Sequence, residues 1–575
     1  MSLKEIVAVA RGEQPADLLL KNARIINTFV AEIEQGNVAI HDGRIAGIGD
    51  YKEAEETIDL QGEFLAPGLI NGHTHIESSM LHPARYAQAV VPRGTSAVVT
   101  DLHEIANVCG LEGIRFVMDW ARRLPLDMLF MAPSCVPATH LETAGARISP
   151  EEVQEILAYP DVIGLGEMMN SPGVVGGEQE VLQKIGAARG RVIDGHAPGL
   201  AGKDLNAYLS AGVMSDHEST TLEEGREKLR RGMYLMIREG SSEKNLEALL
   251  PLVTDNTYNR CFFVVDDRSC SDLLSEGDID AVVRKAIRLG LEPLRAIQMA
   301  TINPAGYFRL YDRGAIAPGY VANLITITDL AKLDVDMVFY RGKLVASEGK
   351  AMFSLPPVNP ELTDTVRIKP LTTESLNVPF PRGERPGEGE ITEEHYPVIE
   401  TVPGQIVTRK ALERVRVVDG MVLPDVEKDI LKLVVVERHR ASGNVGLGLV
   451  KGFGLKRGAL ASSVAHDSHN IIAVGVNDPD ILAAIAEIEK LQGGLVVCAD
   501  QKVLASLPLP VAGLLSPEPL DVVVSLHEGV ERAAAGLGRL PPAPFALLSF
   551  LALPVIPELR LTDLGLVDVA EFKLV

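Results

Sequence analysis

Cysteine is scarce in this chain, and its spacing excludes several kinds of site. Only five cysteines occur among 575 residues, and no two of them form a Cys-x-x-Cys pair. An odd number of widely spaced thiols does not indicate a disulfide framework, and a zinc ribbon needs closely paired cysteines. The zinc deaminases that carry a Pro-Cys-x-x-Cys motif are excluded for the same reason.

Basic residues and long apolar runs are also few. The chain has 55 Lys and Arg against 78 Asp and Glu, which gives a net charge of −23. This acidity argues against a nucleic-acid partner, because phosphates repel negative charge. No apolar stretch reaches the roughly 18 residues of a membrane span, and the N-terminus lacks the pattern of a secretory signal. We therefore expect a cytoplasmic protein that acts on a small molecule and has no membrane partner. The sequence does not decide whether the chain forms a homo-oligomer.

Recurring short apolar runs in the middle of the chain indicate alternating strands and helices. Hydrophobic residues make up 46% and charged residues 23% of the chain, the balance of an ordinary globular protein. Between 64 and 308, eight short apolar runs alternate with segments of helical periodicity, which predicts consecutive βα units around a parallel sheet. We therefore expect an α/β fold with a (β/α)8 TIM-like barrel over 64–308, and a doubly wound sheet is the alternative.

The regions on either side of the barrel predict two further domains. Segments 1–63 and 309–355 both read as short alternating strands, so we expect one small β-sandwich domain built from both flanks. Clustered prolines predict a linker over 356–403. Residues 404–575 are expected to form a C-terminal α+β domain, in which Asp478 is the expected N-cap of the clearest helix.

Side chains that can bind metal follow several of the predicted strands. His73 and His75 end the first barrel strand, and residues two apart on an extended strand point the same way. Both imidazoles can therefore reach one ion, although two surface histidines would show the same spacing. Barrel enzymes keep their active sites at the carboxyl ends of the strands, where four more candidates occur. They are Glu167, His196, His217 and one of the adjacent pair Asp266 and Asp267.

Six candidate ligands are too many for one zinc ion and suit two divalent cations about 3.5–4 Å apart. Glu167 is the natural carboxylate to bridge them. Mixed imidazole and carboxylate ligands fit Mn, Fe, Co or Zn, so ligand softness does not select the metal. A water held between two cations loses a proton near neutral pH and becomes a nucleophile, which predicts metal-assisted hydrolysis.

Other polar residues near the strand ends are candidates for substrate contact. Asp101, His103 and Glu104 follow the second strand and could transfer protons, or form a hydrogen-bond cluster in a loop. His466 and His469 either complete the active site by folding over the barrel mouth or form a local turn. Four more residues are expected to bind substrate or orient the ligands, with helix capping or a surface loop as the alternative. They are Glu77, Ser78, Glu239 and Ser241.

Several motifs resemble one branch of the amidohydrolase superfamily. The run PGLINGHTHIESS looks like the first barrel strand of that superfamily, and GYVANLITI looks like its returning segment, with Asn323 where Asp is usual. Many members carry a bridging lysine after the fourth strand, whereas VIGLGEM offers Glu167 and no lysine. Together with TDLHEIANV, DDRSCSDLL and AHDSHNI, this pattern is similar to the adenine deaminases of the superfamily over essentially the whole chain.

The resemblance implies a chemistry and a role for each motif. It implies hydrolytic deamination of adenine to hypoxanthine and ammonia by a hydroxide between two divalent ions, with Mn or Fe favoured and Zn as an alternative. The same six residues become the ligands. Asp267 rivals Asp266 for the last position, and Asp266 is preferred because it comes first after the apolar run FFVV. Asp266 would also carry a proton to the leaving amine.

Two other functions remain as alternatives at this point. The first is another amidohydrolase that acts on a cyclic amide or a related heterocycle, and the second is a non-enzymatic scaffold that kept the barrel. The missing bridging lysine argues against the hydantoinase-like branch, and the presence of all six candidate ligands argues against a scaffold. The favoured function belongs to purine salvage and adenine catabolism.

Overall fold

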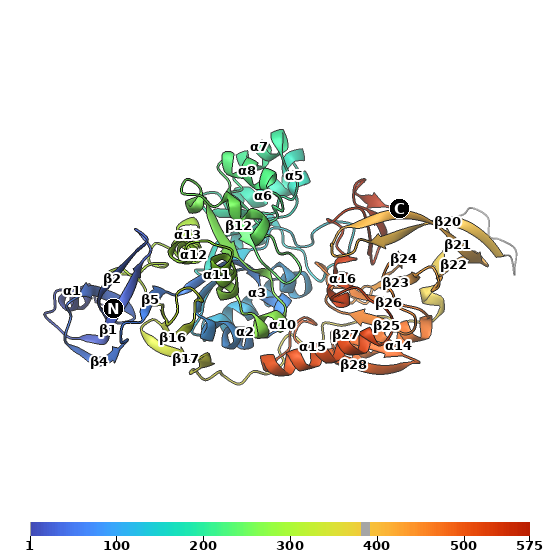
Figure 1. The fold of residues 1–575 in the computed structure, drawn as a ribbon. Helices are drawn as coiled ribbons and strands as arrows, with labels where there is room; N and C mark the ends of the chain where they lie inside the picture. Colours follow the sequence, from blue (N-terminus) through green and yellow to red (C-terminus); the bar gives the residue numbers. More distant parts are fainter. Residues whose placement is uncertain (1, 381–390) are drawn as a thin grey trace.

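The computed structural model describes residues 2–380 and 391–575, which form three neighbouring regions built on sheets (Figure 1). The first region is one nine-stranded sheet to which both flanks of the barrel contribute. The flanks join where β5 pairs with β15 in antiparallel register, with Pro67 opposite Leu324. Strands from both flanking segments therefore pair within one sheet. Its strands are β1 (Ala16–Asn27), β2 (Glu32–His41), β3 (Arg44–Gly49), β4 (Ala54–Asp59), β5 (Phe64–Pro67), β15 (Leu324–Ile327), β16 (Val335–Tyr340), β17 (Lys343–Ser347) and β18 (Lys350–Ala351); helix α1 (Leu3–Ala10) precedes them.

The middle region holds parallel strands that alternate with helices, which confirms the predicted α/β class. One parallel sheet has the order β10-β9-β8-β7-β6-β14, and a second has the order β11-β12-β13. Strand β14 pairs with β6, while the amide of Met214 donates to the carbonyl of Ile193 at the seam between the two sheets. The strands are β6 (Leu69–His75), β7 (Thr95–Asp101), β8 (Asp127–Ala132), β9 (Val162–Met168), β10 (Val192–Gly195), β11 (Ser215–Asp216), β12 (Tyr234–Arg238), β13 (Cys261–Val264) and β14 (Asp266–Asp267).

Helices cover the outer faces of these strands, so the strands can be apolar on both faces. Every residue of β6 and β7 is buried. Some helices begin at a capping motif that is visible in the sequence. At the start of α4, the Ser149 hydroxyl accepts a hydrogen bond from the Glu152 amide, and the Glu152 carboxylate accepts one from the Ser149 amide, which forms a capping box. The helices are α2 (Pro83–Val90), α3 (His103–Ala121), α4 (Pro150–Leu157), α5 (Ser171–Gly176), α6 (Gln179–Ala187), α7 (Gly202–Ser210), α8 (Leu222–Arg230), α9 (Leu246–Leu249), α10 (Cys270–Ser275), α11 (Ile279–Arg288), α12 (Pro293–Met299) and α13 (Ile302–Tyr307).

The third region is a ten-stranded sheet with helices, as expected for the C-terminal α+β domain. The N-cap of α14 is Asn477, whose side chain accepts from the Asp480 amide; the prediction of Asp478 was one residue late, since Asn477 is still extended. The strands and helices are β19 (Val378–Pro379), β20 (Ile391–Thr401), β21 (Thr408–Val418), β22 (Met421–Leu423), β23 (Ile430–Val436), β24 (Val445–Lys451), β25 (Ala459–Ser462), β26 (Ile471–Gly475), β27 (Gly494–Ala499), β28 (Lys502–Pro508), α14 (Asp478–Leu491), α15 (Leu520–Ala535) and α16 (Pro544–Phe550); a separate small sheet contains β29 (Leu559–Thr562), β30 (Gly565–Asp568) and β31 (Lys573–Leu574).

The segment expected as a linker contains both irregular chain and sheet. Residues 391–401 form β20, which pairs along its whole length with β21. Two of the prolines that suggested the linker, Pro381 and Pro386, lie outside the described residues. None of the helices in the described parts of the chain combines the length and hydropathy needed to cross a bilayer.

The C-terminal domain lies directly against the carboxyl ends of the barrel strands (Figure 1). The amide of Thr143, in the loop after β8, donates to Asp563 at 2.8 Å, and Asn470 donates to the carbonyl of Thr143 at 2.8 Å. In the loop after β6, the amide of His82 donates to the carbonyl of Ser516 at 2.9 Å. Loops that follow barrel strands are therefore covered by the second domain.

Candidate metal centre and active-site cavity

The structure brings the six predicted metal ligands together at the carboxyl ends of the barrel strands. His73 and His75 end β6, and Glu167 lies near the end of β9. The loops that follow β10 and β11 begin with histidines, and β14 begins with the aspartate. All six side chains are buried except one histidine, which is partly exposed at the cavity. The histidines after β10 and β11 are His196 and His217, and the aspartate is Asp266; the partly exposed side chain is that of His196.

The two oxygens of Glu167 face two different pairs of histidines. Its Oε1 lies 3.1 Å from Nε2 of His75 and 3.9 Å from Nε2 of His73. Its Oε2 lies 2.7 Å from Nδ1 of His196 and 3.3 Å from Nε2 of His217. One carboxylate thus divides four imidazoles into two groups, which is the arrangement that a carboxylate bridging two cations requires.

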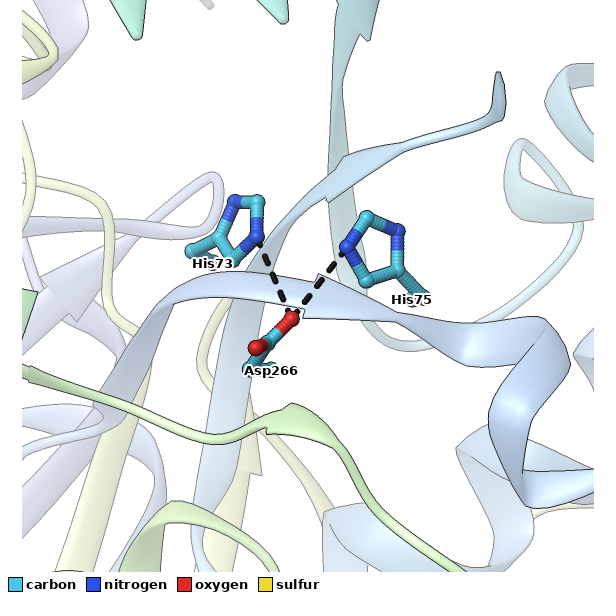
Figure 2. A group of neighbouring side chains, drawn as sticks. All are labelled: His73, His75 and Asp266. Atoms are coloured by element: carbon cyan, nitrogen blue, oxygen red, sulfur yellow. Dashed lines mark ion pairs between the residues drawn. The ribbon is translucent and has the colours of Figure 1, made fainter. Parts of the chain in front are cut away.

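Asp266 completes the first of these groups (Figure 2). Its Oδ1 lies 3.4 Å from Nε2 of His73 and 3.3 Å from Nε2 of His75. Its backbone is in the left-handed region, at φ +63°, a conformation that Asp tolerates better than most residues. Its Oδ2 accepts a hydrogen bond from Nη1 of Arg238 at 2.7 Å. Asp267 instead accepts a hydrogen bond from Ser78 and does not meet the two histidines.

The donor set fits divalent metal. Nε2 of His73 is buried among the described residues without a hydrogen-bond partner, although buried polar atoms almost always have one. That nitrogen is the atom directed at Asp266, so a cation there would satisfy it. Several overlapping groups of His and carboxylate atoms in this cluster are close enough to share an ion. Burial raises the pKa of Glu167, but His217 and His196 lower it well below its usual range, so the carboxylate stays ionised.

A cavity of about 580 Å³ opens from this cluster, and both domains line it. From the barrel, His103 and Glu104 lie beside the metal-binding groups at the start of α3. The C-terminal domain contributes His466 and Phe550, whose rings stack at 4.8 Å between centroids. The cavity combines many polar side chains, mainly from the barrel side, with apolar ones, and its size is typical of a small-molecule site. Its other C-terminal lining residues are Gly404, Gln405, Ile406, Val407, Asp467, Leu553, Val555, Ile556 and Pro557.

Some predicted catalytic and substrate-binding residues lie behind the ligands and do not line the cavity. Asp101 accepts from the amide of Glu167 at 3.0 Å and from the amide of His103 at 3.1 Å. Glu77 accepts from the amide of Ile105 at 3.3 Å, and burial together with the charge of Glu104 raises its pKa to about 7. These contacts place Asp101 and Glu77 as supports of neighbouring backbone.

Glu239 and Ser241 point away from the cavity, contrary to their expected place in a substrate pocket. Glu239 forms an ion pair with Lys285, and the hydroxyl of Ser241 donates to Asp272. Only Arg238 and Glu243 of this loop line the cavity. The loop turns back on itself after β12, so adjacent residues face opposite ways.

Two residues at the site, Glu218 and Phe550, carry no assigned role from the sequence. Arg238 contacts both Asp266 and Glu218, and Glu218 Oε1 lies 3.5 Å from Nε2 of His217. Glu218 could have been found from the sequence, because it is an acidic residue directly after the candidate ligand His217. Phe550 had no such signal, because it comes from an apolar run far along the chain.

Comparison with known proteins adds the family. Residues 64–345 match the amidohydrolase family, and residues 405–573 match the adenine deaminase C-terminal domain. A protein named adenine deaminase from Dehalococcoides mccartyi is 60% identical over 100% of this chain and 99% of its own length. The chain belongs to the adenine deaminase family. Another member, adenine deaminase 2 from Carboxydothermus hydrogenoformans, is 50% identical over 100% of this chain and 99% of its own length.

More distant matches occur among solved structures. A β-aspartyl dipeptidase from Fervidobacterium islandicum is 16% identical, with a TM-score of 0.46 over 59% of this chain and 98% of that chain. In the present chain, Asn323 lies away from the cavity, and its side-chain amide donates a hydrogen bond to Asp127 at 3.0 Å. The departure from the usual Asp thus falls outside the site.

Proposed function

We propose that this chain hydrolyses adenine to hypoxanthine and ammonia with two divalent metal ions. The observation that carries the proposal is the position of Glu167 between two pairs of histidines, in a chain whose full-length relatives are named adenine deaminases. The cavity of about 580 Å³ also has room for a small base, and its polar lining residues offer hydrogen-bond partners to the ring nitrogens.

The residues divide into two metal-binding groups. His73, His75 and Asp266 would hold one ion together with Oε1 of Glu167. The second group is His196 and His217 with Oε2 of Glu167. Bound divalent ions would act as Lewis acids and lower the pKa of the attacking water. Mixed nitrogen and oxygen ligands suit Mn or Fe, and Zn is the alternative.

The reaction needs two proton transfers. The attacking water adds to C6, and one of its protons must reach N1 of the purine while the other must reach the exocyclic amine, which leaves as ammonia. Glu104 lines the cavity and is assigned to carry the proton to N1. Asp266, whose Oδ2 accepts a hydrogen bond from Arg238, is assigned to carry the other proton to the amine. His103 is assigned to substrate contact beside Glu104.

Three predicted residues take supporting roles in this proposal. Asp101 holds the backbone of Glu167, and Ser78 holds Asp267. Glu77 holds the first turn of α3. Asp266 is preferred over Asp267 as the ligand of the first ion, because Asp266 alone faces the two histidines of β6.

A substrate comparison tests the proposal. The metal-loaded protein is incubated separately with adenine and with a cyclic amide such as dihydrouracil, and released ammonia and ring opening are measured. We expect ammonia from adenine and no ring opening of the amide. Faster hydrolysis of the amide would instead assign the chain to the cyclic-amide hydrolases.

A further inference from the structure

Glu104 receives contacts from two histidines that come from the other domain. His466 Nδ1 lies 2.7 Å from Oε1 of Glu104, and Nε2 of His469 contacts Oε2. Both histidines belong to the loop between β25 and β26, more than 360 residues further along the chain. All three side chains are buried or nearly so, with Glu104 at 2% exposed. Each oxygen of the carboxylate therefore has its own imidazole.

The loop itself decides which nitrogen of His469 carries the proton. Nδ1 of His469 accepts a hydrogen bond from the backbone amide of Ala465 at 3.2 Å. A ring nitrogen that accepts from an amide bears no proton, so the proton of the neutral ring is on Nε2. The amide of His469 also donates to the carbonyl of Ala465 at 2.7 Å, which anchors the turn. His469 therefore presents an N–H donor to Glu104.

His466 is the second donor and also faces the cavity. Burial lowers its pKa, but the carboxylate of Glu104 more than offsets that effect and raises it to about 9, so the ring is a cation at neutral pH. Burial lowers the pKa of His469 to about 4, so that ring is neutral. Other titratable groups that face this cluster are His103, with Nε2 3.6 Å from Oε1 of Glu104, and Asp467, with Oδ1 3.9 Å from Nδ1 of His466.

A third metal ion is the competing explanation, since Glu104, His466 and His469 also lie close enough to share one. A metal ligand must offer a lone pair, and Nε2 of His469 has a proton in the observed arrangement. Both carboxylate oxygens of Glu104 and both ring nitrogens of His469 have hydrogen-bond partners without a metal ion.

We propose that His466 and His469 are positioning residues by which the C-terminal domain holds Glu104 as a carboxylate, with its oxygens aimed for proton transfer in the cavity. The proposal rests on the proposed function, because it gives Glu104 its state before the reaction. A carboxylate fixed by two donors first accepts a proton from the attacking water and then passes it to N1 of the purine. It also gives the C-terminal domain a task in the chemistry.

Amide substitutions test this with a crossed pattern. The amide nitrogen of Asn can replace Nδ1 of His, and that of Gln can replace Nε2. His466 uses Nδ1, so His466→Asn should retain most of the kcat and His466→Gln should lose about 100-fold, the cost of misplacing a reacting group. His469 uses Nε2, so the order reverses: His469→Gln should retain most of the kcat, and His469→Asn should lose about 100-fold. KM should change little in the two His469 variants, because His469 does not line the cavity.

The controls separate positioning from structure. His395→Ala alters an exposed histidine of the same domain, on β20, and should behave like the unsubstituted chain. Long-range ¹⁵N–¹H spectra of the histidine-labelled full chain should show His469 protonated at Nε2. Equal losses for Asn and Gln at both positions would mean a structural role, and full activity in all four would mean no role; either result overturns the proposal.

Two further outcomes are kept apart. Loss of a metal equivalent in His469→Asn, measured by elemental analysis, would overturn the proposal in favour of a third ion. If the unsubstituted chain deaminates no adenine, the proposed function fails, while the ¹⁵N spectra and the crossed pattern on the substrate then found still decide the positioning role. A proton on Nδ1 of His469 would overturn it whatever the substrate.

Discussion

A buried lysine behind the metal centre gives a prediction whose magnitude follows from the structure. Lys228, on α8, is 1% exposed, and its ammonium contacts Asp216 at 2.8 Å and the carbonyl of Ala197 at 2.7 Å. Asp216 also accepts from the amide of Ala197 at 2.9 Å. Ala197 follows His196, and Asp216 precedes His217, so this ion pair ties together the two loops that carry the second group of histidines.

Replacing Lys228 with Met removes the cation and leaves Asp216 buried without it. Breaking one side of a buried ion pair costs about 3–5 kcal/mol. At about 2–4 °C per kcal/mol for a domain of this size, Tm should fall by about 6–20 °C. We expect this shift in calorimetric scans of the metal-loaded protein, compared at one scan rate because large proteins often unfold irreversibly. Lys203→Met, at an exposed position on α7, is the matched control.

The double variant Asp216→Asn with Lys228→Met tests the cause. It removes both charges of the Lys228–Asp216 pair and leaves only Glu224, which also contacts Lys228 at 2.8 Å, without its cation, so Tm should recover part of the loss. The pKa of Asp216 lies below its unfolded value of about 3.9 because Lys228 outweighs the effect of burial, so the stabilisation is present above pH 4 and is lost as pH falls further. The deficit of Lys228→Met should therefore shrink between pH 7 and pH 3. A Tm within about 2 °C of the control would refute this reasoning.

Three other substitutions or treatments have defined outcomes. Asp266→Asn should lower the metal content and abolish deamination, while Asp267→Asn keeps both ions; elemental analysis showing the reverse would exchange their roles. Chelation should remove activity, and back-titration should need two equivalents of metal for full recovery; recovery with one would exclude a binuclear centre. Ser149→Ala should cost about 1 kcal/mol through loss of the cap of α4 and leave kcat unchanged, as checked by denaturation and assay; an unchanged free energy of unfolding would mean that the capping box contributes nothing.

The parallel strands and the cluster of candidate metal ligands could be predicted because their signals are local. His73 and His75 face one side since a strand has a period of two residues. Strand ends converge at one face of a parallel barrel, which brought Glu167 to them. The directions of loop side chains carry no such periodicity: Glu239 and Ser241 follow a strand end and yet face away.

Contacts between domains were the least predictable part of the site. His466 was left between two interpretations because its partner, Glu104, is 362 residues away in sequence, and no spacing pattern reports such a pairing. Phe550 was missed for the same reason. The role of Asp101 was predicted as catalytic from its place after a strand, but its carboxylate holds the backbone of Glu167 instead of facing the cavity.

The central claim is that the groups around Glu167 hold two ions that support hydrolysis of adenine. The most direct measurement follows the absorbance change from adenine to hypoxanthine while Mn²⁺ is titrated into the metal-free chain. The account predicts that activity appears and reaches its plateau at two ions per chain, and that Glu167→Gln lacks it. No turnover of adenine with Mn²⁺, Fe²⁺ or Zn²⁺ would contradict the account.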